Sequence, residues 1–86
     1  MELYQNNLGK RIRHFRSEQG WTQAELGERT GKARQKLGGS PKALGQDRVA
    51  AIEGGRSGIS MEMLFALSIA LEVQPGSLLA FPVVGA

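Results

Sequence analysis

The sequence of 86 residues contains no cysteine and a single histidine, His14. Without thiols, a disulfide framework, a thiolate nucleophile and a zinc site of cysteine and histidine ligands are excluded. We therefore expect neither a structural metal nor a cofactor. The length suits one modest hydrophobic core, so residues 1–86 are expected to form a single domain.

Long apolar runs are also missing. The longest mainly apolar run, residues 63–71, is interrupted by Ser68 and is far shorter than the roughly 20 residues that span a bilayer. Residues 1–15 place their charges after the apolar residues and lack a small-residue cleavage site, unlike a secretory signal. We therefore expect a cytoplasmic protein without membrane association.

Catalytic patterns are scarce. His14 and Asp47 are the only histidine and the only aspartate, and no motif typical of a serine–histidine–aspartate triad surrounds either one. The sequence also lacks the G-x-x-x-x-G-K-[ST] phosphate-binding loop, so residues 38–41 are interpreted as a turn. These absences favour a binding protein and not an enzyme.

Positive charge is confined to one part of the chain. All 11 Lys and Arg lie between Lys10 and Arg56, whereas residues 57–86 carry only Glu62 and Glu72 as charged side chains. Clustered cations are typical of nucleic-acid binders, because neutralising phosphates releases counterions. A basic face that is merely solvated is the alternative at this point.

The apolar spacing predicts helices and no strands. A first helix is indicated by apolar residues at intervals of four, four and three, namely Tyr4, Leu8, Ile12 and Phe15. Gly20 is expected to end it, and Thr22 with Glu25 forms a capping box that starts a second helix. Trp21, just before this box, is interpreted as a hydrophobic staple that packs on Leu26.

The second helix is expected to be short, because Gly31 offers a stop. Residues 32–43, KARQKLGGSPKA, contain four cations and no acid, and are interpreted as a basic loop. A third helix carrying Val49 and Ile52 is expected to begin after Gly45 and to end at Gly54 and Gly55.

Two further helices are predicted. Ser60 caps the fourth, which is apolar nearly all round and is therefore expected to be buried, with its methionines in the core. Pro75 suits the first position of a short last helix carrying Leu78 and Leu79. The expected fold class is all-α, with five helices.

Two segments carry a family resemblance. Residues 8–31, LGKRIRHFRSEQGWTQAELGERTG, and residues 47–79, DRVAAIEGGRSGISMEMLFALSIALEVQPGSLL, resemble the Cro/repressor-like helix-turn-helix domain of the Xre family. In such a domain the third helix is the recognition helix, which enters the major groove of DNA by its N-terminal end. The turn before it normally has a few residues, so residues 32–43 look like an insertion.

The resemblance implies structural roles for several side chains. It places an ion pair, largely buried, between Arg16 and Glu53, which ties the first helix to the recognition helix. It also calls for a small residue at Gly27. Gln23 and Gln46 are expected side by side, with Gln23 bracing the site or contacting a phosphate.

The resemblance also implies residues that contact DNA. The expected base-reading residues are Gln46, Asp47, Arg48 and Ala51. Beyond Gln23, the expected phosphate contacts are Arg56 and Ser57 after the recognition helix and Lys32, Arg34, Lys36 and Lys42 in the insertion. Exposed backbone amides beside Arg56 are expected to assist it.

The function expected from the resemblance is a sequence-specific transcriptional regulator, a repressor of bacterial or phage type associated with the nucleoid. Because one module covers little DNA, we expect a homodimer on two half-sites. The apolar tail, residues 81–86, either forms a dimer patch or packs on its own core. The alternative function is an antitoxin or adaptor that uses the same fold to hold a protein partner.

Overall fold

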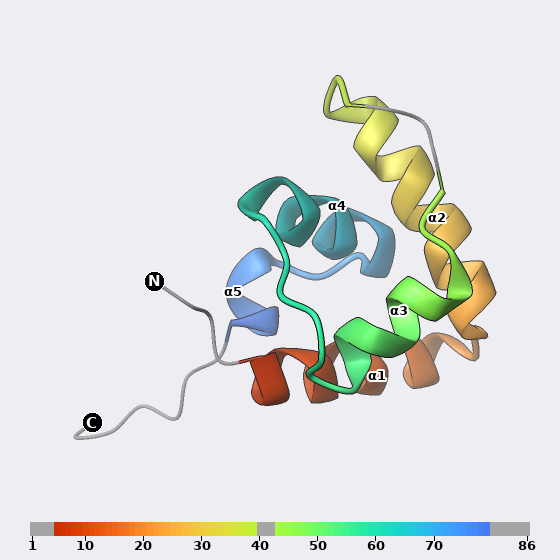
Figure 1. Ribbon diagram of the computed structural model, residues 1–86. Coiled ribbons are helices and arrows are strands. Elements are labelled where there is room, and N and C mark those ends of the chain that lie inside the picture. Colours follow the sequence, from red (N-terminus) through yellow and green to blue (C-terminus); the bar gives the residue numbers. More distant parts are fainter. Residues whose placement is uncertain (1–4, 40–42, 80–86) are drawn as a thin grey trace.

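The computed structural model describes residues 5–39 and 43–79, and in these ranges it contains helices and no strand (Figure 1). The helices are α1 (Gln5–Gln19), α2 (Gln23–Lys36), α3 (Gln46–Glu53), α4 (Met61–Leu71) and α5 (Pro75–Leu78). This all-α architecture confirms the predicted fold class. Within the described ranges, no helix is both long enough and apolar enough to cross a membrane.

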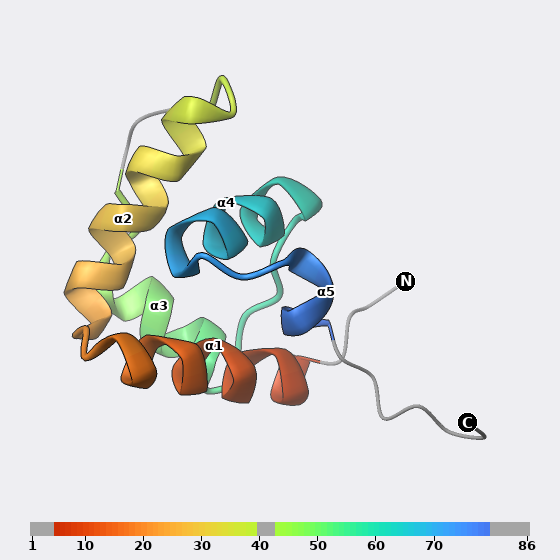
Figure 2. The same cartoon turned by 180° about the vertical axis from the view of Figure 1, so that it is seen from behind.

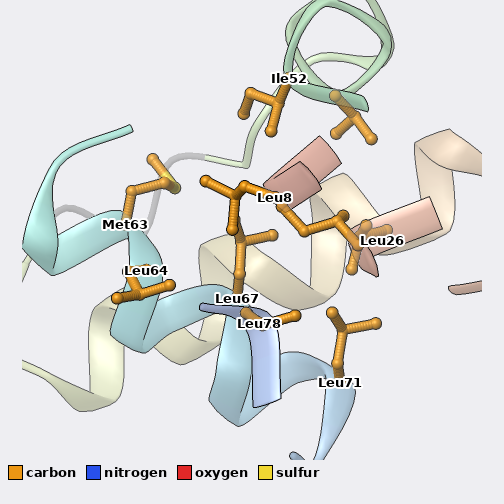
Figure 3. Close-up of a cluster of buried hydrophobic side chains, with 10 residues drawn as sticks. Leu8, Leu26, Ile52, Met63, Leu64, Leu67, Leu71 and Leu78 are labelled. Carbon is orange, nitrogen blue, oxygen red and sulfur yellow. The ribbon is translucent and has the colours of Figure 1, made fainter. Parts of the chain in front are cut away.

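All five helices contribute to one core. Figure 3 shows Leu8 of α1, Leu26 of α2, Ile52 of α3, Leu67 of α4 and Leu78 of α5 converging on the interior. None of these five side chains is more than 3% exposed. Burial of apolar side chains in one shared cluster is therefore the main force that holds the short helices together, since isolated helices of this length are marginal in water.

The predicted helix boundaries are largely confirmed. Thr22 accepts a hydrogen bond from the Glu25 amide, and the Glu25 carboxylate accepts one from the Thr22 amide, which is the expected capping box. Gly45, Ser60 and Gln74 occupy the N-cap positions of α3, α4 and α5. Each of these boundaries depends on a local signal that the sequence displays.

Three helices end at a glycine in the left-handed backbone region. Gly20 follows α1, Gly38 follows α2 and Gly55 follows α3, with φ of 73°, 83° and 73°. After each helix the next amide reaches back five residues, as in the bond from the Trp21 amide to the Arg16 carbonyl, a pattern that satisfies the last carbonyl groups. After α4 the left-handed position is held by Glu72, with φ of 57°.

The prediction that α2 stops at Gly31 is wrong. Helix α2 continues to Lys36, so residues 32–36 of the expected basic loop are helical, and the true stop is Gly38. A glycine inside a helix costs about 1 kcal/mol relative to alanine. Burial of Thr30, Gly31 and Ala33 offsets that cost. The insertion is therefore largely an extension of α2, and Ser40, Pro41 and Lys42 lie outside the described residues.

The prediction that α4 is buried on nearly all sides, with its methionines in the core, is also wrong. Met63 is buried, but Met61, Phe65 and Ile69 are 59%, 43% and 40% exposed. These three side chains recur every four residues and share the face of α4 that points away from the core. The sequence did not indicate which side of α4 faces solvent, because apolar residues surround the helix and leave no polar face.

Candidate nucleic-acid interface

The C-terminal end of α3 is fixed to two other helices through Glu53. Its carboxylate accepts hydrogen bonds from Arg16 Nε at 2.6 Å and Arg16 Nη2 at 3.0 Å, and from Gln23 Nε2 at 3.2 Å. The ion pair that the resemblance implies is therefore present, and Gln23 braces it. The same arginine donates from Nη1 to the Trp21 carbonyl at 2.8 Å, so one guanidinium links α1, the α1–α2 turn and α3.

This ion pair is shielded from water. The side chains of Arg16 and Glu53 are 14% and 4% exposed. Hydrogen bonding to Glu53 is the main cause that raises the pKa of Arg16; burial opposes it, and the negative charge of Glu53 adds a smaller increase. Such a desolvated, two-point contact fixes the direction of both side chains as well as their distance.

Helix α1 approaches α3 directly at Gly9. A β-carbon at this position would overlap the carbonyl groups of Ile52 and Glu53. Sequence reasoning missed Gly9, although a glycine inside a helix is itself a signal of close packing. The backbone contact at Gly9 and the ion pair at Glu53 together fix the C-terminal half of α3 against α1.

The N-terminal end of α3 is fixed to α2. The Leu44 amide donates to the Gly27 carbonyl at 3.1 Å. A β-carbon on Gly27 would overlap the Leu44 carbonyl, so the small residue that the resemblance calls for is required here. Helix α3 thus has one defined position on α2.

With both ends fixed, α3 presents its N-terminal half to solvent. Gln46, Asp47 and Arg48 are exposed and Ala51 is partly exposed, whereas Val49 and Ile52 are buried in the core. In Figure 1 this helix lies in front of α1, with its N-terminal end beside the N-terminal half of α2. The predicted base-reading residues are therefore accessible, and the first turn of α3 carries one acid, one base and one amide.

The loop after α3 differs from the expectation of free backbone amides. The amides of Gly54, Gly55 and Arg56 all donate to carbonyl groups of α3, at 2.9, 3.1 and 2.9 Å. They close the helix and are not available to a phosphate. The Arg56 side chain is exposed, and the Ser57 hydroxyl donates to the Gly58 carbonyl at 3.2 Å. Within this loop the Arg56 guanidinium is therefore the charged group that remains open to a phosphate.

The cations of the α2 extension, residues 31–39, and of the segment after it have different surroundings. Lys32 and Lys36 are exposed. Arg34 is partly buried, and its Nε lies 3.5 Å from Glu62 Oε1 on α4. Lys42, the fourth predicted contact, lies outside the described residues. Among the described residues, Lys32 and Lys36 of the extension are thus exposed and in no ion pair, whereas Arg34 braces the extension on α4.

Trp21 and Arg29 complete the surface around the start of α2. The indole is partly buried against the core cluster that contains Leu26, in agreement with its interpretation as a staple. The Arg29 guanidinium carbon lies 4.1 Å from the ring centroid, a cation–π contact. Among the described residues, no group of three or more metal-ligating side chains comes together.

Several solved structures resemble the chain. The restriction-modification controller protein C.AhdI from Aeromonas hydrophila has a TM-score of 0.68 and 25% identity, with 84% of this chain and 91% of that chain covered. The P22 c2 repressor, solved in complex with a synthetic operator, has a TM-score of 0.66 and 29% identity, with the same coverage of 84% and 91%. The clp gene regulator ClgR from Corynebacterium glutamicum has a TM-score of 0.71 and 25% identity over 93% of this chain and 88% of that chain.

No protein-family model and no curated protein sequence matches the chain. The similar structures are regulators of transcription and not enzymes, and they do not favour the alternative of an antitoxin or adaptor. The fold and the exposed recognition helix therefore define a helix-turn-helix protein. More narrowly, the similarity to these structures supports an Xre-like transcriptional regulator of the Cro/repressor type.

Proposed function

We propose that this protein represses transcription by binding operator DNA, with the N-terminal half of α3 in the major groove. The observation that carries the proposal is the fixed position of α3. Gly27 and Leu44 hold one end and Arg16 and Glu53 hold the other, while the face between them is open to solvent. A reading helix that is rigid before binding loses little conformational entropy when it meets DNA.

Each proposed base contact follows from side-chain chemistry. The Gln46 amide matches the N6 and N7 edge of adenine, and the Arg48 guanidinium matches O6 and N7 of guanine. Asp47 can accept a hydrogen bond from the cytosine amino group, and the Ala51 methyl group suits the thymine methyl. Asp47 also opposes nearby phosphates, so it contributes to selectivity more than to affinity.

Contacts with the DNA backbone would position the exposed N-terminal half of α3 on the operator. We assign phosphate binding to the exposed guanidinium of Arg56, with the Ser57 hydroxyl beside it. Gln23 serves as a brace, because its amide nitrogen already donates to Glu53. Contacts of this kind set the register of a protein on DNA without reading its sequence.

The active form that we propose is a homodimer in the cytoplasm, associated with nucleoid DNA. A single module of this size buries only about 600–1,000 Å² against DNA, so two copies on two half-sites supply the specificity that a repressor needs. The half-sites would be about one helical turn apart. The apolar tail considered for dimer contacts, residues 81–86, lies outside the described residues.

Selection of bound duplexes from a random DNA pool tests this function. We expect enrichment of a pseudo-palindrome with half-site centres about 10 base pairs apart. Gln46→Ala should relax preference at one position of each half-site. Gln74→Ala makes the same chemical change at an exposed position before α5 and should leave preference unchanged. Binding to random DNA without any enrichment would contradict the proposed function.

A further inference from the structure

The α2 extension, residues 31–39, begins beyond the point where α3 is attached. The Leu44 amide meets the Gly27 carbonyl at 3.1 Å, which places the start of α3 beside the second turn of α2. The rest of α2 continues past that point. Both Figure 1 and Figure 2 show its end, with the turn that follows, projecting beyond the other helices.

The extension is anchored on α4 and is part of the folded domain. Ala33 is only 3% exposed, and the Arg34 guanidinium lies 3.5 Å from the Glu62 carboxylate. The Gly39 amide donates to the Arg34 carbonyl at 2.8 Å and closes the helix. A side chain on the solvent side of this segment is therefore carried by a rigid support.

The charge on that solvent side is positive. Residues 31–39 contain no acid, and the acids of α2, Glu25 and Glu28, lie in its first half. Glu62 compensates Arg34 by the ion pair, which leaves Lys32 and Lys36 exposed without an acid in the extension. A rigid segment with two exposed cations suits a polyanion better than a neutral ligand.

We propose that the α2 extension is a second phosphate-binding surface, on which Lys32 and Lys36 contact DNA backbone outside the stretch that α3 reads. This inference rests on the proposed function and specifies where the protein extends its contact with DNA. At 1.5 Å per residue, the two lysines lie about 8 and 14 Å along α2 from Gly27. The major groove is about 12 Å wide, so a helix centred in it lies roughly 6 Å from the backbone on either side. Both lysines extend beyond that distance.

The test uses the operator selected by the parental protein in two lengths. The long duplex extends a full helical turn beyond each half-site, and the trimmed duplex ends at the half-sites. Lys32→Gln with Lys36→Gln should lower the slope of log affinity against log salt by about two on the long duplex, since each lost phosphate contact removes about 0.9. On the trimmed duplex the variant and the parental protein should bind alike.

A charge-matched control separates a local contact from general attraction. Lys10→Gln with Arg13→Gln removes the same charge from exposed positions of α1 and should not produce the difference between long and trimmed duplexes. Equal losses in both double variants would overturn the inference in favour of unspecific attraction. An unchanged slope on the long duplex would also overturn it, because the extension would then face away from DNA.

The proposed function and this inference can fail separately. If the parental protein enriches no sequence, the proposed function is wrong and the inference falls with it. If it enriches an operator and the Lys32 and Lys36 variant binds the long duplex like the parent, only the inference is wrong. Unfolding curves of both double variants should match the parental curve, because all four side chains are exposed.

Discussion

The carboxylate of Glu53 and the guanidinium of Arg16 form a two-point contact across 37 residues of chain, at 2.6 and 3.0 Å. No other ion pair of the described residues has both partners so well shielded from water. Because Arg16 also holds the Trp21 carbonyl, this arginine fixes the recognition helix and the turn before α2 at once.

Arg16→Ala should therefore destabilise the protein by about 3 kcal/mol, because Glu53 is left buried without its partner. Chemical denaturation followed by circular dichroism measures this change. Arg13→Ala removes an exposed arginine from the same helix and should change stability by less than about 0.5 kcal/mol. A loss that small for Arg16→Ala would show that the pair is solvated in solution.

The contribution of Arg16 to stability should not vary with pH near neutrality. The contact with Glu53 raises the pKa of Arg16 above its ordinary value. A group whose pKa is raised by folding stabilises the folded state fully below its unfolded pKa, and loses this effect as the pH passes the folded pKa. For Arg16, the pH range between the unfolded and the folded pKa lies in strongly alkaline solution. The difference in unfolding free energy between the parental protein and Arg16→Lys should thus stay constant from about pH 6 to 9, and a steep change would contradict this.

Gly9→Ala should cost about 2 kcal/mol or more, because the added methyl group would overlap backbone carbonyl groups of α3 that cannot move aside. Gly76→Ala is the matched control, since a β-carbon there meets nothing within 4 Å. We expect its stability to be unchanged or raised by up to about 1 kcal/mol. Thermal unfolding distinguishes the two variants, and equal behaviour would place α1 farther from α3.

Glu72→Gly should stabilise the protein by about 0.5–1 kcal/mol, because glycine adopts the left-handed conformation after α4 without the steric cost that glutamate bears. The reciprocal substitution is Gly20→Ala, at a left-handed position where a β-carbon meets nothing within 4 Å. It should lower stability by about 1 kcal/mol. Opposite signs in urea denaturation are the expected result. A loss for Glu72→Gly would mean that the glutamate side chain contributes more than its backbone conformation costs.

Arg56→Ala should weaken binding to every DNA sequence and lower the salt slope by about one, since it removes one phosphate contact. Fluorescence anisotropy with the operator and with random duplexes measures both quantities. The amides of Gly54, Gly55 and Arg56 are already bonded to α3, so these three would not replace the lost guanidinium. A change confined to one operator position would instead make Arg56 a base-reading residue.

Local signals predicted the helix ends well and the surroundings of α2 and α4 poorly. Thr22, Glu25 and Gly20 act within a few residues of chain, so their effect is visible in the sequence. The stop expected at Gly31 failed because contacts with α4, which follows 30 residues later, decide whether α2 continues. Propensity is a weak signal when tertiary burial opposes it.

In the candidate site, too, features set by nearby residues were predictable, whereas features set by distant contacts were not. The exposed positions of α3 follow from the spacing of Val49 and Ile52, because these two core residues fix which face remains for DNA. The pairing of Arg16 with Glu53 came from the family resemblance, since the residues alone favour two solvated charges. The amides of Gly54, Gly55 and Arg56 are bonded because the chain closes α3 at this point. The pair of glycines indicated such a helix end, but the prediction of a phosphate site treated these amides as free.

The attachment of Leu44 to Gly27 has a consequence for chain length. The two helices of the motif are brought into register by residues that stand 17 positions apart in the sequence but 3.1 Å apart in space. The position of α3 on α2 is therefore fixed by this contact, and not by the number of residues between Gly27 and Leu44. A sequence pattern that demands a fixed number of residues between the two helices would therefore miss this chain.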